Sequence, residues 1–302
     1  MDGLPRLRLV VVFNHKYDNN LDKLDAIYRD RFPDTRYLVP FYQGSRSDVI
    51  PVHESSAQFQ GYFAHATHAY IDPAVSHYAF IADDLLLNPD IHAGNLLERF
   101  GVGAGEACIE NLNPLNNNSF EWPHTIGALF AWPPERFVMY RQELPTAEAA
   151  AARFAKHGVT FADITWRNLR GNNGWKRYPG WHHALKLMVQ RKGRIPLPDP
   201  MAMTYADIVI VPRESIRQFA HLCGVFAAMR LWVEIAIPTA LALSCDRIVQ
   251  LLHGSQPRRQ IWTQAEVDDL ERRTDRRVSR AFDVVGRDHL YIHPVKLSRW
   301  TV

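Results

Sequence analysis

Two adjacent carboxylates, Asp83 and Asp84, directly follow the apolar segment His77–Ala82 (HYAFIA). Neighbouring acids repel each other unless a cation or hydrogen-bond donors offset their charges. In open α/β sheets, ligands bind outside the carboxyl ends of the strands, where these acids would lie. A divalent metal that also binds a diphosphate would balance them. The alternative is a turn or a helix cap, because aspartate caps helices well.

A single carboxylate, Glu234, lies in the otherwise apolar stretch LWVEIAIPT (residues 231–239). Burial of an unpaired carboxylate is costly and raises its pKa, and a raised pKa suits a general base. We therefore predict that Glu234 accepts a proton. A structural ion pair with Arg230 or another cation is the alternative.

The C-terminal segment YIHPVKLS (residues 291–298) contains His293 and Lys296. A histidine at the end of a strand can bind a metal ion, and a lysine can meet phosphate oxygens as a mobile point charge. Alone this pattern is weak, because a buried structural histidine is the commoner case.

Two other sequence patterns give weaker evidence for a binding site. The glycines of Gly101–Gly105 follow a predicted helix, whereas a dinucleotide-binding motif must follow a strand and open a helix. Trp175 lies in the loop GNNGWKRYPG (residues 171–180), and Trp181 follows it. These aromatic rings could stack on a sugar ring, or they could anchor the loop to the core.

The composition is that of an ordinary globular enzyme. The chain has 302 residues, 47% of them hydrophobic, and its 35 basic and 32 acidic residues give a net charge of +3. These values exclude a disordered chain and do not indicate a nucleic-acid partner. Three cysteines without a CxxC pair argue against a disulfide framework or a structural zinc site and fit a reducing compartment.

Targeting and membrane signals are weak. The first apolar run, Leu9–Phe13, is too short for a signal peptide. Glu234 and Pro238 interrupt the most apolar stretch, Leu231–Cys245, so we predict a buried helix there and a cytoplasmic protein. The basic run Glu271–Arg280 is either a solvated helix face or a contact with anionic lipid or a lipid-linked substrate.

The elements that must position these residues alternate along the first part of the chain. The hydrophobic pattern predicts strands at Arg6–Phe13, Arg36–Phe41 and His77–Ala82, and helices at Leu21–Phe32, His53–Tyr70 and Ile91–Phe100. This alternation predicts an α/β fold with a mainly parallel sheet flanked by helices.

The second part of the chain is richer in loops and helices. It predicts helices at Thr146–His157 and Glu214–Met229, and short strands at Ile208–Val211 and Leu290–His293. We expect one domain with two halves, residues 1–110 and residues 111–302.

The acid pair Asp83–Asp84, the segment with Glu234 and the segment with His293 follow one another along the chain. In this order they resemble a GT-A-type glycosyltransferase of the bacterial kind that builds surface polysaccharides. Val10–Phe13 is similar to the first strand of that family, and FIADD, ending at Asp84, is similar to its DxD motif. DIVIVP (residues 207–212), a helix and then LWVEIAIPT resemble the acceptor-side block with the catalytic carboxylate. YIHPVKLS resembles the segment that carries the metal-binding histidine. One departure is clear: Ala82 stands where the first acid of a DxD motif would be.

The resemblance implies a nucleotide-sugar donor, most often a UDP-sugar, and a glycan acceptor, which a lipid could carry. Residues 1–110 would bind the donor, and residues 111–302 would bind the acceptor. Mn²⁺ or Mg²⁺ would bind to Asp84, Asp83 and His293. The donor would contact five residues, Phe13, Asn14, His15, Asp83 and Lys296. Glu234 would be the base if the reaction inverts configuration and would position the acceptor if it retains it. Trp175 and Trp181 would contact the acceptor.

Two other functions fit the same residues. A metal-dependent nucleotidyl- or phosphotransferase also needs acids at strand ends. A non-catalytic protein that binds nucleotide sugars would use the acids and aromatic rings for recognition alone.

Overall fold

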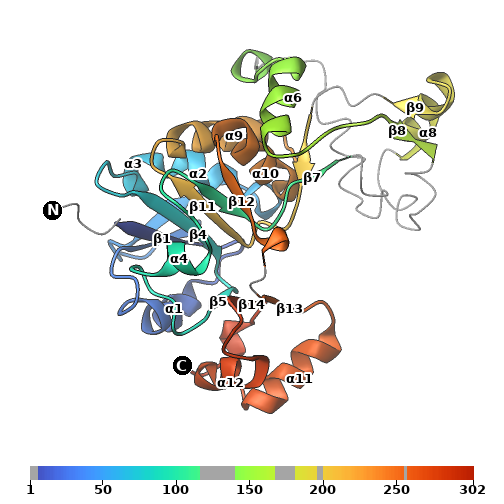
Figure 1. The fold of residues 1–302 in the computed structure, drawn as a ribbon. Coiled ribbons are helices and arrows are strands. Elements are labelled where there is room, and N and C mark those ends of the chain that lie inside the picture. Colours follow the sequence, from blue (N-terminus) through green and yellow to red (C-terminus); the bar gives the residue numbers. More distant parts are fainter. Residues whose placement is uncertain (1–5, 116–139, 167–180, 196–199, 255–256) are drawn as a thin grey trace.

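The computed structural model of the protein describes residues 6–115, 140–166, 181–195, 200–254 and 257–302. It is an α/β fold built around a seven-stranded mixed sheet with helices on both faces (Figure 1). The strands, in spatial order, are β12 (Ile248–Gln250), β6 (Ala107–Ile109), β11 (Ile208–Pro212), β4 (His77–Ala82), β1 (Leu7–Val12), β2 (Thr35–Pro40) and β3 (Val49–Val52). Only β11, among these seven, is antiparallel to its neighbours. The prediction of a mainly parallel sheet is confirmed.

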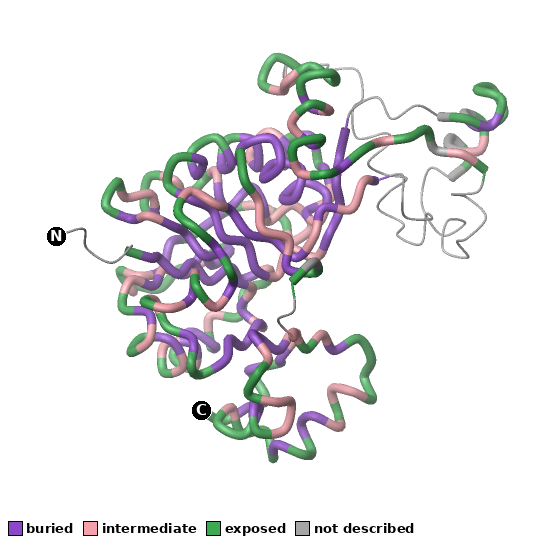
Figure 2. Tube along the Cα trace, in the orientation of Figure 1, coloured by how far each residue is buried: buried purple, intermediate pink, exposed green. Residues whose placement is uncertain are grey.

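The central strands are buried on both faces, as a continuous apolar sequence predicts for a parallel sheet. All six residues of β1 are buried. Because side chains alternate along a strand, Val10 packs into the core on one face, and Leu9 and Val11 pack into the core on the other. Figure 2 shows the buried strands between the two layers of helices.

The helices belong to two layers. The first core contains residues of α2 (Gly61–His65), α3 (Thr67–Tyr70), α6 (Ala147–Lys156), α9 (Ile216–Ala228) and α10 (Val233–Ser244). The second contains residues of α1 (Leu21–Tyr28), α4 (Leu96–Arg99), α11 (Gln264–Thr274) and α12 (Ala281–Val285). The 3₁₀ helices are η1 (Asp18–Asn20), η2 (Ser56–Gln58), η3 (Tyr140–Glu143), η5 (Leu251–His253), η6 (Val278–Arg280) and η7 (Leu297–Arg299).

Three small sheets complete the described part of the chain. They pair β13 (Arg259–Gln260), β14 (Tyr291–His293) and β5 (Leu86–Leu87); β10 (Ala202–Met203) and β7 (Asn113–Pro114); and β8 (Ile164–Thr165) and β9 (Arg194–Ile195). Helix α8 (Trp181–Gln190) packs beside β9. β14 pairs with β5, which begins just after Asp84, so the chain end returns to the acid pair. The Lys23 ammonium donates to the carbonyls of Leu297, Ser298 and Trp300 and holds this end on α1.

Three predicted helices are shorter than the sequence indicated, and the first of them, Leu21–Phe32, ends as α1 at Tyr28. The range His53–Tyr70 contains η2, α2 and α3, because the backbone leaves the helical region at Ala66. Of Ile91–Phe100, only Leu96–Arg99 forms an α-helix. Before it, the Asn95 side chain accepts from the His92 N–H, and the His92 ring accepts from the Gly94 N–H. Such local side-chain bonds compete with the helix.

The apolar stretch predicted to be a buried helix is α10, and its interior is buried. Within the described residues, no helix is both long and apolar enough to cross a bilayer.

The basic run is largely neutralised by acids beside it. Arg272 and Arg273 pair with Asp269, and Arg276 pairs with the buried Glu271. This pairing favours the solvated-face interpretation of the run.

Candidate functional site

A cavity of about 280 Å³ opens at one edge of the central sheet. Polar groups reach it from five elements that are far apart in the sequence: Asn14, Asp84, Asp207, Glu234 and His293. Phe59, Phe63 and Phe80 are among its apolar lining residues. A small concave site with a few convergent polar groups is typical of a ligand-binding site.

The strand order explains why these residues meet. From β1, the chain turns to β2 and β3 on one side and later places β4 on the other side. Ligands bind in the crevice that such a switch point creates, outside the carboxyl ends of the strands. Asn14 follows β1 and Asp84 follows β4, so both lie at this crevice. Because β11 is antiparallel, its amino end brings Asp207 to the same edge.

His293 lies between two carboxylates. Its Nε2 is 3.2 Å from Asp84 Oδ1, and its Nδ1 is 3.1 Å from Asp207 Oδ2. Gln260 also approaches both groups: its Oε1 is 3.3 Å from His293 Nδ1, and its Nε2 is 3.4 Å from Asp207 Oδ2. Burial lowers the pKa of His293, but Asp207 and Asp84 outweigh this effect and raise it to about 10. The imidazole is therefore charged at neutral pH in the unliganded protein.

The two acids of the predicted pair have different environments. Asp83 is buried, and its N–H donates to the Val12 carbonyl, whereas Asp84 lines the cavity. Burial and the charge of Asp84 raise the pKa of Asp83 to about 8, against hydrogen bonds from the backbone of Asp83 and Asn14. The Asp83 carboxyl is thus largely protonated at neutral pH, so the pair carries less than two negative charges.

This raised pKa makes the stability of the protein depend on pH. The folded pKa of about 8 lies above the unfolded value near 3.9, so the contribution of protonated Asp83 is complete below pH 4 and is lost as the pH rises to 8. We expect Asp83→Asn to raise the free energy of unfolding relative to the wild type, by about 3 kcal/mol more at pH 8.5 than at pH 5.5. Urea unfolding in EDTA at both pH values measures the difference.

Asp30→Asn is the control, because Asp30 is exposed and the same change there should give no pH-dependent gain. Equal effects of Asp83→Asn at both pH values would show that Asp83 is ionised in the folded protein.

Glu234 lies in the first turn of α10 and faces the cavity. Burial raises the pKa of Glu234 to about 7, and Asp207 adds to the rise, while a hydrogen bond from Trp232 and the charge of His293 oppose it. The indole Nε1 of Trp232 donates to Glu234 Oε2 at 3.2 Å. Among the described residues, no ion pair joins Glu234 to Arg230, and the cation that acts on Glu234 is His293 in the same cavity.

A proline fixes the backbone of this turn. Pro238 has no N–H to donate to the carbonyl of Glu234 four residues earlier. The N–H of Thr204 donates to that carbonyl instead, at 3.0 Å. Helix α10 is therefore tied, through Glu234, to the segment that leads into Asp207.

Three of the predicted donor-binding residues, Phe13, His15 and Lys296, do not line the cavity. His15 is exposed at its rim, with Nδ1 3.0 Å from the Oγ of the cavity residue Ser56. Phe13 is fully buried in the second core, so its side chain faces away from the cavity. Lys296 is exposed and outside the cavity lining.

The predicted acceptor residues belong to a different part of the chain. Trp175 lies outside the described residues, and Trp181 begins α8, which is far from β14 in Figure 1. The described residues of α8 are absent from the cavity lining.

Sequence reasoning missed Asp207 and Gln260 as site residues. Asp207 directly precedes the buried strand β11, and this position was its only sequence signal. If β11 were parallel to its neighbours, Asp207 would lie at the opposite edge of the sheet, away from Asp84. Gln260 carries no sequence signal, because a single glutamine beside a two-residue strand has no distinctive pattern.

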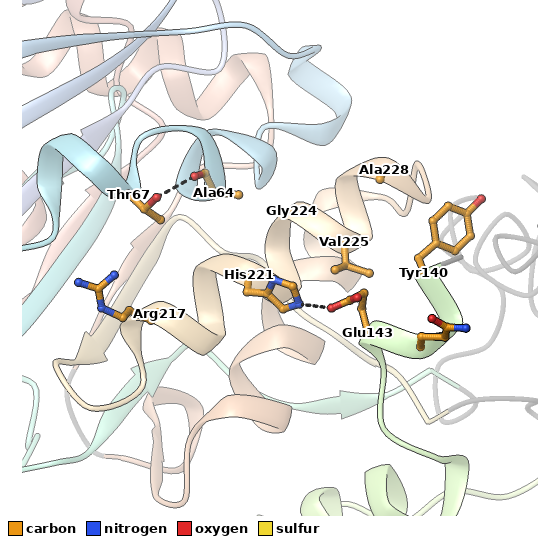
Figure 3. Close-up of a pocket in the computed structure, with 10 residues that line it drawn as sticks. Ala64, Thr67, Tyr140, Glu143, Arg217, His221, Gly224, Val225 and Ala228 are labelled. Carbon is orange, nitrogen blue, oxygen red and sulfur yellow. Dashed lines mark hydrogen bonds and ion pairs between the residues drawn. The ribbon is translucent and has the colours of Figure 1, made fainter. Parts of the chain in front are cut away.

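A larger surface depression of about 690 Å³ lies between α2, α9 and η3 (Figure 3). Its His221 is ion-paired with Glu143 at 3.0 Å, and both side chains are about half exposed. None of the predicted site residues lines it. The smaller cavity is the better candidate because three acids and His293 converge there, and the pKa values of Glu234 and His293 are shifted.

Asp84 and His293 fit a shared divalent ion. Asp84 Oδ1 and His293 Nε2 are 3.2 Å apart, a spacing that neighbouring ligands of one ion with bonds of about 2.0–2.2 Å adopt. Asp207 on the other ring nitrogen is the outer partner that metal-binding histidines usually have. Among the described residues, no group of three or more His, Cys, Asp or Glu side chains has metal-site geometry, so the remaining ligands would come from substrate and water.

Comparison with known proteins gives no relative: no family model matches the chain, and no curated protein is significantly similar to it.

Proposed function

We propose that the protein is a GT-A-type glycosyltransferase that moves a sugar from a nucleotide-sugar donor to a hydroxyl group of a glycan acceptor in surface-polysaccharide synthesis. The observation that carries this proposal is the convergence of Asp84, Glu234 and His293 in one cavity at the switch point of the sheet. The mixed, mainly parallel sheet supports the GT-A fold. A UDP-sugar is the donor that the resemblance favours.

In this proposal, residues on one side of the cavity bind the donor, and Glu234 on the other side acts on the acceptor. Asp84 and His293 lie on the donor side, beside Asn14 and the carboxyl end of β1. Glu234 lies at the amino end of α10 and, when ionised, accepts the proton of the attacking hydroxyl group. The apolar lining around it excludes water and favours attack by the acceptor over hydrolysis.

Asp84 and His293 would hold a Mn²⁺ or Mg²⁺ ion, and bound there the ion would stabilise the negative charge that develops on the departing diphosphate. His293 must lose its proton to act as a ligand. Asp207 and Gln260 then hold the neutral ring in place through Nδ1.

The pKa of Glu234 predicts how the transfer rate depends on pH. Only the ionised form accepts a proton, so at saturating Mn²⁺, which keeps His293 deprotonated, kcat/KM should be constant well above pH 7 and fall on the order of tenfold per pH unit well below it. Initial rates of nucleotide release from pH 5 to 9 give this profile. A flat profile across pH 7 would remove Glu234 as the base.

The first test is incubation with a panel of nucleotide sugars and Mn²⁺, with and without EDTA, while nucleotide release is followed. Release of nucleoside diphosphate from one donor, abolished by EDTA, supports the proposal and identifies the sugar. Release of pyrophosphate would indicate a nucleotidyltransferase instead. Binding without turnover, even with a glycan mixture present, would indicate a binding protein.

A further inference from the structure

Trp262 exposes its ring beside the candidate site. Its exposed fraction is 60%, although burial of tryptophan is strongly favourable. Its ring lies against that of Tyr205, with ring centroids 4.8 Å apart and an interplanar angle of 54°. The two residues belong to segments that are far apart in the sequence, so the tertiary fold builds this aromatic pair.

Both aromatic residues adjoin the polar wall of the cavity. Tyr205 precedes Asp207 by two residues, and Glu234 and Asp207 both contribute to the raised pKa of its phenol, after burial. Gln260, which contacts Asp207 and His293, precedes Trp262 by two residues. The N–H of the residue between them, Ile261, donates to the His293 carbonyl and continues the hydrogen-bond ladder between β13 and β14. The contact with Tyr205, two residues before Asp207, therefore places the Trp262 ring near the polar wall of the cavity.

The backbone at Trp262 is held in place. Glu266 accepts from the N–H groups of Trp262 and Thr263 at 2.9 and 3.0 Å, and the Thr263 hydroxyl accepts from the Glu266 N–H. This capping box starts α11. Arg259 pairs with the same Glu266 carboxylate at 3.0 Å. The exposed ring is thus presented from a fixed backbone, which lowers the entropy cost of binding a ligand.

We propose that Tyr205 and Trp262 form an aromatic platform that binds a neutral sugar ring of the acceptor next to Glu234. A hexopyranose has a face of C–H groups that packs on an aromatic ring and hydroxyl groups around its edge that form hydrogen bonds. The wide ring of Trp262 would pack against the C–H face of the sugar, and the Tyr205 hydroxyl and the indole N–H would form hydrogen bonds with its hydroxyl groups. A sugar ring on this platform lies on the Glu234 and Asp207 side of the cavity.

This inference deepens the proposed function and rests on it for the role of the bound sugar. The platform would replace Trp175 and Trp181 as the acceptor-binding residues. A neutral sugar is favoured over a charged one because the charged groups near the pair already have partners: Glu266, beside Trp262, is paired with Arg259, and Asp207 is paired with His293.

The test measures sugar binding without donor or metal. Saturation-transfer NMR is recorded with methyl glycosides of glucose, galactose and mannose, using the wild-type protein, Trp262→Ala and Trp262→Phe. At least one glycoside should bind the wild type, and Trp262→Ala should weaken its binding about tenfold. Trp262→Phe should retain most of the affinity. Trp166→Ala is the matched control, because Trp166 is also exposed but lies at the end of β8, away from the cavity.

The outcomes separate this inference from the proposed function. If no glycoside binds the wild type, or if Trp262→Ala binds as well as the wild type, the platform is wrong, whatever the donor panel shows. If glycosides bind through Trp262 but no nucleotide sugar is turned over, the platform stands and the transferase proposal fails.

Discussion

Replacement of Glu234 by glutamine should reduce sugar transfer about 10³-fold while leaving donor binding nearly unchanged. The amide has almost the shape of the carboxyl group, and its oxygen can still accept from the Trp232 indole. It cannot accept the proton of the acceptor hydroxyl group. The loss should therefore appear in kcat, and KM for the donor should stay near the wild-type value.

Two measurements check this expectation. Initial rates of transfer give kcat, and calorimetric titration of the variant with the nucleoside diphosphate of the active donor gives the donor-side affinity. Glu143→Gln serves as the control, because Glu143 is a half-exposed acid in the other depression. Full activity of Glu234→Gln would discard the base assignment. Equal losses of donor binding and activity would instead assign Glu234 to donor binding.

Replacement of Asp84 by asparagine should reduce transfer by at least about 10²-fold and weaken Mn²⁺ binding. The change removes the negative charge from an oxygen 3.2 Å from His293 Nε2. EDTA should lower wild-type activity to the level of the variant and have little further effect on the variant itself.

Paramagnetic resonance of free Mn²⁺ measures metal binding independently of activity. Asp90→Asn is the matched control, since Asp90 is an exposed acid in the same part of the chain. If EDTA does not change the activity and Asp84→Asn is fully active, leaving-group stabilisation must come from the protein's own cations, among which Lys296 is the first to examine.

The sequence predicted the central elements well because their signals are local. Strands β1, β4 and β11 and helices α9 and α10 are long apolar or amphipathic runs, and each lies where its pattern indicated. Strand β3 was not predicted, because Pro51 interrupts its pattern. In the structure this strand lies at the edge of the sheet, where a residue without an N–H is tolerated.

The candidate site was predicted in part. Asp84, Glu234 and His293 could be selected from the sequence because each is a polar residue at the edge of an apolar segment, and they line the same cavity. Asp207 could not, because its position depends on the direction of β11, which is a property of the whole sheet. The different states of Asp83 and Asp84 also required burial to be known, since adjacent acids look equivalent in a sequence.

The 209 residues between Asp84 and His293 have a consequence for the order in which the protein is made. A ribosome synthesises the acid pair long before the cation that faces it, and β14 joins β5 only when the last tenth of the chain has emerged. Burial raises the pKa of Asp83, so this acid is buried with its proton and needs no cation from the end of the chain to offset its charge. The sheet can therefore close early, and the cavity acquires its charge balance as one of the last events of folding.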